Sequence, residues 1–155
     1  MADLPSLALT LIQPWGTLII AGHKPIENRT WAPDSRLRPG DRLWIHGGKS
    51  WDEDAVDLAR CILRPAPDLS DAPRGFLLGH VRYEGVCHAS PSPWFFGPVG
   101  WRLSDPVSLA VPVPCRGAQA FVLGTTGVFP NESSVLDGVK LTLVGLVVLA
   151  YGMYR

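Results

Sequence analysis

The sequence lacks the signatures of several protein classes. Its cysteines, Cys61, Cys87 and Cys115, are odd in number and form no Cys-x-x-Cys or Cys/His pattern. A structural zinc site is therefore not expected, and reduced thiols in a cytoplasmic protein are the simplest account. The N-terminus has no basic segment followed by an apolar run, so no signal peptide is expected. We expect neither a metal nor another cofactor.

The chain also lacks an excess of charge of either sign, since its 155 residues include 14 basic and 14 acidic side chains. This balance argues against a uniformly basic surface that binds polyanions without specificity. The charges are unevenly placed, because residues 22–50 are rich in cations and residues 52–71 in acids. A locally basic face is therefore compatible with a neutral protein. Most of the cations are arginine, which suits planar recognition of phosphate, although a GC-rich genome would give the same bias.

The pattern of apolar and turn residues predicts an α+β fold in one domain, a small mixed β-barrel of five to seven strands with two helices near the N-terminus. A short helix should follow Pro14, and a second should cover residues 51–63 after a capping box that begins at Ser50. Gly47 and Gly48 should end the third strand. The expected strands cover residues 7–12, 26–31, 42–46, 75–86, 101–103, 107–113 and 118–123.

The C-terminal segment differs from the rest of the chain. Residues 141–154 carry no charge and lie between Lys140 and Arg155. As a helix this stretch would be about 21 Å long, short of the roughly 30 Å hydrocarbon layer of a bilayer. A buried strand or helix is favoured, and an anchor for a membrane or a protein partner is the alternative. Membrane association is not expected.

Polar side chains are concentrated between Gln13 and Lys49 in three groups, each close to glycine, proline or tryptophan. The candidate ligand-binding residues are Gln13, Trp15, Lys24, Glu27, Arg29, His46 and Lys49. If the chain is extended after Pro25, Glu27 and Arg29 point to the same face. A carboxylate beside a guanidinium on one strand face is either a structural ion pair or the floor of a polar site.

Each of the other candidates also has a structural interpretation. Lys24 could be a buried ammonium of lowered pKa, or a surface lysine that caps helix carbonyls. Trp15 and Trp31 could stack on unpaired bases, although tryptophan in a small barrel is more often part of the core. His46 and Lys49 flank two glycines and could hold an anion near a helix start, or simply form a loop.

These residues resemble the ASCH domain, a member of the PUA-like β-barrel superfamily. The resemblance covers residues 5–123 and leaves residues 124–155 as an apolar extension without a counterpart. It depends on the order and spacing of several motifs. They are Gln13-Pro14-Trp15, the series Gly22, Lys24, Glu27, Arg29 and Trp31, the series Gly40, Asp41, Ile45, His46 and Lys49, the strand at residues 79–86, and the segments at 97–101 and 114–118.

The resemblance implies a barrel with a polar cleft between the first helix and the sheet. Members of the family are thought to bind RNA or other nucleic acids, and some relatives are amidohydrolases that deacetylate acetylcytidine. In that hydrolase branch the motif resembles Gly-x-Lys-x-x-Thr-x-Arg, whose lysine falls on Lys24. Glu27 occupies the position of the threonine, so the hydroxyl of that motif is absent here.

Two functions from different classes follow. The first is a binding module that holds RNA or a modified nucleotide, with cations on phosphate, an aromatic ring on a base, and Gln13 or Glu27 on its polar edge. The second is a small amidohydrolase acting on an acylated nucleoside, with Lys24 and Glu27 as its catalytic residues and Glu84 as a further carboxylate. Because Glu27 stands where the hydrolase motif has threonine, we rank the enzyme below the binding module. A protein adaptor that uses the C-terminal segment is a third interpretation.

Overall fold

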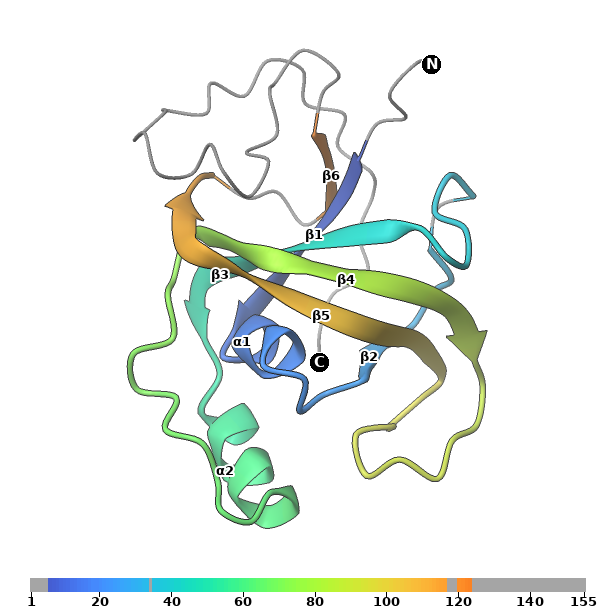
Figure 1. The fold of residues 1–155 in the computed structure, drawn as a ribbon. Helices are drawn as coiled ribbons and strands as arrows, with labels where there is room; N and C mark the ends of the chain where they lie inside the picture. Colours follow the sequence, from blue (N-terminus) through green and yellow to red (C-terminus); the bar gives the residue numbers. More distant parts are fainter. Residues whose placement is uncertain (1–5, 34, 117–119, 124–155) are drawn as a thin grey trace.

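The computed structural model describes residues 6–33, 35–116 and 120–123, which form one six-stranded sheet and two helices (Figure 1). The strand order is β2-β5-β4-β3-β1-β6. Only the β1–β3 pair is parallel among these neighbours, so the sheet is mixed. The elements are β1 (Ser6–Gln13), α1 (Trp15–Ile20), β2 (Ile26–Arg29), β3 (Arg42–Trp51), α2 (Glu53–Ile62), β4 (Phe76–Cys87), β5 (Val99–Pro114) and β6 (Ala120–Leu123).

The sheet curls around α1, which contacts β1, β3, β4 and β5 from the concave side (Figure 1). The expected barrel-like α+β fold is thereby confirmed at the level of its elements. Strands β2 and β6 are the two edges of the sheet, and the pairing within the described residues leaves the barrel open between them. The extension at residues 124–155, including its apolar stretch, lies outside the described part of the chain.

Three local expectations were wrong. β5 is one long strand where two were expected, because it pairs with β4 along its length and accommodates irregularities as register shifts. β3 continues through Gly47, where a Cβ would collide with the Gln13 amide, so the glycine permits close packing and does not end the strand. α2 is capped by Asp52, whose carboxylate accepts from the Asp54 N–H at 3.0 Å, and not by Ser50.

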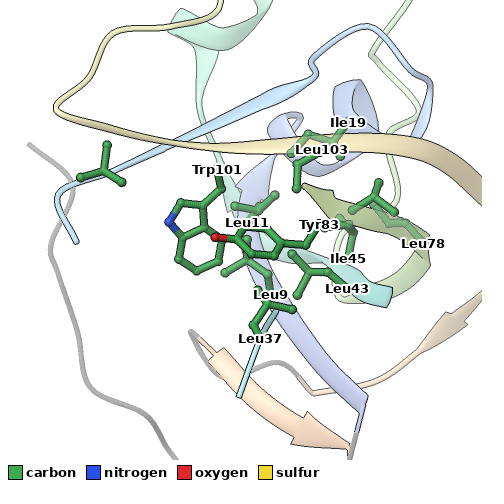
Figure 2. Packing of buried hydrophobic residues seen from close by; sticks show 12 residues of the cluster. Leu9, Leu11, Ile19, Leu37, Leu43, Ile45, Leu78, Tyr83, Trp101 and Leu103 are labelled. Atoms are coloured by element: carbon green, nitrogen blue, oxygen red, sulfur yellow. The ribbon is translucent and has the colours of Figure 1, made fainter. Parts of the chain in front are cut away.

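The main core fills the concave side of the sheet. Alternate residues of β3, such as Leu43 and Ile45, point into it, while Trp44 between them belongs to a smaller cluster on the other face. In Figure 2, Trp101 and Tyr83 lie among the leucines and isoleucines of this core. A further cluster joins α1 to α2 and contains the buried Trp94. The core therefore holds both α1 and β5 in place, and the turn between α1 and β2 lies close to both.

Candidate functional site

The turn between α1 and β2 directs Lys24 into the protein. Gly22 follows the helix with φ +82°, a conformation that glycine adopts without strain. The backbone N–H groups of His23 and Lys24 then both donate to the Leu18 carbonyl, at 3.0 and 3.1 Å. This tight helix end places the Lys24 side chain against the sheet, where it is only 3 % exposed.

The Lys24 ammonium has three close partners. Its Nζ donates to Glu27 Oε2 and to the Ile26 carbonyl, each at 2.6 Å, and lies 5.3 Å from the centre of the Trp15 ring. Burial lowers the pKa of Lys24 below its ordinary 10.5, and the Glu27 carboxylate opposes that shift. The surface-lysine interpretation is therefore wrong, and Lys24 is a buried ammonium held by a carboxylate.

Glu27 also joins Lys24 to Arg29. Its second oxygen, Oε1, lies 3.2 Å from Arg29 Nη2, so both residues point to the same side of β2, as the extended conformation predicts. The Arg29 guanidinium lies over the rings of Trp31 and Trp101, at 5.8 and 5.9 Å from their centres. We call Lys24, Glu27 and Arg29 the buried charge cluster. With Lys24 protonated, it contains two cations and one anion.

The cluster is enclosed rather than open. Glu27 is fully buried, whereas the Arg29 side chain keeps 9 % of its surface exposed. The expected convergence of Lys24 and Glu27 is therefore present, but the two side chains do not line a water-filled cleft. Arg29 and the half-buried Trp31 are the residues of this region that keep part of their side chain at the surface.

Gln13 is placed inside the fold. It is fully buried, and its amide nitrogen donates to Thr17 Oγ1 and to the Pro73 carbonyl at 2.9 and 2.7 Å. Its oxygen accepts from the Thr17 N–H at 3.0 Å. The side chain thus ties the first turn of α1 to the segment that precedes β4, and in this structure it presents no polar group to a ligand.

His46 has a similar internal role. Its Nδ1 lies 3.1 Å from Thr10 Oγ1 and its Nε2 lies 3.1 Å from the Cys115 carbonyl. Burial lowers the pKa of His46 below its ordinary 6.5, so the neutral ring is favoured, with Nε2 donating to the carbonyl. Lys49, in contrast, is exposed and lies apart from the buried charge cluster at the far end of β3.

Trp15 serves both the helix junction and the cluster. Its indole N–H donates to Asp52 Oδ2 at 2.8 Å, and its ring meets Trp94 edge to face. Since its ring also covers Lys24, Trp15 belongs to the packing around the ammonium. Glu84 lies elsewhere, because it accepts from the Ser104 hydroxyl on the face opposite the core residues Tyr83 and Leu103.

Sequence reasoning missed Trp101 and Asn28. Trp101 pairs with Glu27 across β2 and β5, and its indole N–H donates to the Trp31 carbonyl at 3.2 Å. Asn28 clamps the loop before β5 by donating to the Trp94 carbonyl and accepting from the Phe96 N–H. Asn28 belongs to β2 itself, whereas only the strand register brings Trp101 beside this strand, and no local motif marks that register.

Within the described residues, no three His, Cys, Asp or Glu side chains gather in a way that could hold a metal ion. None of the helices described here has the length and hydrophobicity needed to cross a bilayer.

The ASCH domain family model matches residues 9–94, which is more than half of the chain and includes the whole buried charge cluster. The chain belongs to the ASCH domain family. No curated protein matches this ASCH sequence.

The solved structures similar to this chain include two from Zymomonas mobilis. One is the crystal structure of its ASCH protein, with a TM-score of 0.49, 12% identity, and coverage of 88% of this chain and 97% of that chain. The other is a mutant of the same protein, with a TM-score of 0.46, 13% identity, and coverage of 86% and 96%.

Proposed function

We propose that this ASCH domain binds RNA or a modified nucleotide at the surface end of the buried charge cluster. The observation that carries the proposal is the placement of two cations, Lys24 and Arg29, around the single carboxylate of Glu27. Two cations this close together make the surface around Arg29 electropositive, which favours a ligand with a negative group. A phosphate at Arg29 would supply it.

The ligand contacts in this proposal come from Arg29 and Trp31. Glu27 and two indole rings fix the guanidinium, so little side-chain entropy is lost when it binds a phosphate or a base edge. Within the described residues, the buried indole N–H of Trp31 has no hydrogen-bond acceptor. A ligand acceptor would satisfy that donor, and the half-buried ring offers a surface for a base.

Lys24 and Glu27 act in this scheme as positioning residues. Glu27 divides its two oxygens between the cations, and Lys24 holds one of those oxygens while its remaining donors meet a carbonyl and a ring. The pair therefore orients Arg29 from behind. This role needs no direct contact between either residue and the ligand.

The test measures the affinity of a fluorescent, random-sequence single-stranded RNA and of a panel of modified nucleosides. Trp31→Phe keeps an aromatic side chain but removes the indole N–H together with the five-membered ring, so it should weaken binding by at least the about three- to tenfold that one hydrogen bond contributes. Arg29→Lys should weaken it by about tenfold or more, because lysine lacks the planar fork. Arg82→Lys, an exposed control on β4, should bind like the wild type.

Absence of binding by the wild-type protein to any of these probes would overturn the proposal. So would wild-type affinity in both Trp31→Phe and Arg29→Lys, provided that far-ultraviolet circular dichroism shows both variants folded.

The amidohydrolase is the second candidate, and the lowered pKa of Lys24 beside Glu27 favours it. A buried lysine of this kind can remove a proton from water that attacks an amide. Among the described residues, the hydrogen-bond and ring partners of Lys24 include no hydroxyl or thiol nucleophile, so water would have to attack directly. Release of the acyl group from acetylcytidine by the wild type but not by Lys24→Met would establish this function.

A further inference from the structure

Three cations follow the same row of the sheet at its far end. Gly47 of β3 pairs with Phe76 of β4, which in turn pairs with Pro114 of β5. Two residues beyond these positions, toward one end of the sheet, stand Lys49, Arg74 and Arg116. The strand ends that carry them lie together on one side of the molecule (Figure 1). We call these three residues the cation row.

Backbone hydrogen bonds continue the sheet toward this row. The Gly75 N–H donates to the Gly47 carbonyl at 2.7 Å, and the Cys115 N–H donates to the Gly75 carbonyl at 3.0 Å. Neighbouring strands in a sheet are about 4.8 Å apart. The backbones at Gly47, Gly75 and Cys115, which lie one or two residues from the three cations, are therefore close neighbours although they are far apart in the sequence.

Two buried polar side chains, Gln13 of β1 and His46 of β3, bind the backbone segments that carry Arg74 and Arg116. The amide of Gln13 binds the Pro73 carbonyl, immediately before Arg74. The ring of His46 binds the Cys115 carbonyl, immediately before Arg116. Gln13 and His46 therefore fix the backbone from which two of the three cations project, which accounts for side chains that the buried charge cluster does not use.

All three side chains of the row are exposed, and none forms an ion pair within the described residues. The Lys49 stem packs over Gly75, and the Arg74 guanidinium lies 5.7 Å from the centre of the Trp51 ring. The neighbouring acid Glu53 accepts from the Trp51 indole N–H. Like charges on neighbouring strands repel each other. An anion bound from solution would reduce the repulsion among these three cations.

We propose that the cation row binds successive phosphates of a single-stranded RNA. The inference builds on the proposed RNA binding and adds a second surface that reads the backbone, while Arg29 and Trp31 hold a nucleotide. A row of cations at the ends of adjacent strands suits a linear polyanion. The stacking of Arg74 on Trp51 orders the guanidinium in advance, which lowers the entropy lost on binding.

The experiment measures the affinity of random-sequence single-stranded RNA as a function of salt concentration. The variant Lys49→Gln/Arg74→Gln/Arg116→Gln removes the row. For single strands each lost phosphate contact lowers the slope of log affinity against log salt by about 0.7, so the slope should become shallower by about 2. At low salt the affinity should fall by about tenfold or more.

The control variant Arg38→Gln/Arg42→Gln/Arg60→Gln removes the same number of exposed cations from other parts of the surface. It should retain a salt slope close to that of the wild type. An equal loss of slope in the row variant and in the control would overturn the inference, since net charge alone would then explain both.

The outcomes separate this inference from the proposed function. If the wild type binds RNA and the row variant keeps both its affinity and its salt slope, the cation row does not bind RNA. The proposed nucleotide site at Arg29 and Trp31 is then unaffected. If the row variant loses slope while Trp31→Phe and Arg29→Lys bind normally, the row stands and the nucleotide site is wrong. Binding of the wild type to anionic lipid vesicles but not to RNA would overturn the row as an RNA surface.

Discussion

The protein contains two groups of positive charge that differ in burial and in ion pairing. In the buried charge cluster, Glu27 binds both cations, and aromatic rings cover them. In the cation row, the side chains are exposed and form no ion pair within the described residues. One group lies at the β2 edge of the sheet and the other at the far ends of β3, β4 and β5.

The difference shows how burial decides what a charge contributes. A buried ion pair affects stability strongly when one partner is removed, because the other is left without compensation in a medium of low dielectric constant. An exposed cation is solvated and screened by salt, so it contributes little to folding but attracts polyanions over a distance. We therefore expect stability and salt-dependent binding to separate between the two groups.

The largest expected effect comes from removing the anion of the buried cluster. Glu27→Gln removes the buried carboxylate that binds both Lys24 and Arg29 and should lower the free energy of unfolding by about 3–5 kcal/mol. Urea denaturation followed by circular dichroism measures this change. Asp57→Asn, which breaks the exposed pair with Arg60, is the matched control and should change the stability little. Equal effects of the two substitutions would remove the distinction between buried and exposed charge.

A smaller change in the free energy of unfolding is expected from the titration of Lys24 with pH. Because burial lowers its pKa in the folded protein, the unfolded chain binds more protons at this residue as the pH approaches 10.5 from below. The contribution of Lys24 to the free energy of unfolding should therefore increase with pH in that window, by no more than about 1.4 kcal/mol per pH unit. Lys24→Met should lack this increase, and other alkaline titrations, including that of Tyr83, cancel in the difference between the two proteins. A difference that stays constant with pH would contradict the shift.

Much of this architecture could be predicted from local sequence signals. The spacing of Glu27 and Arg29 on an extended segment placed both on one face, and Gly22 marked the end of the first helix. The ASCH resemblance identified the family and the residues that converge on Lys24. These features depend on backbone periodicity and on chain neighbours, which the sequence shows directly.

The remaining features depend on strand register, which is a property of the whole sheet. No local signal shows that Trp101 lies opposite Glu27, or that Lys49 and Arg74 end the same row. The enclosure of Gln13 and His46 follows from close packing around Gly47 and from carbonyl groups distant in sequence. A polar side chain near a glycine pair therefore suggests a ligand site when read locally, although in the fold it positions another segment.

The smallest expected change in stability comes from a single substitution in the cation row, which should alter RNA binding but not folding. Arg74→Gln removes one cation from the row and some packing on Trp51, while relieving repulsion from its neighbours, so the free energy of unfolding should change by less than about 0.5 kcal/mol. The same variant should bind single-stranded RNA with a salt slope shallower by about 0.7. Urea denaturation and RNA titrations on one preparation measure both quantities. A large loss of stability with an unchanged slope would mean that Arg74 belongs to the packing of the fold and not to a surface for phosphate.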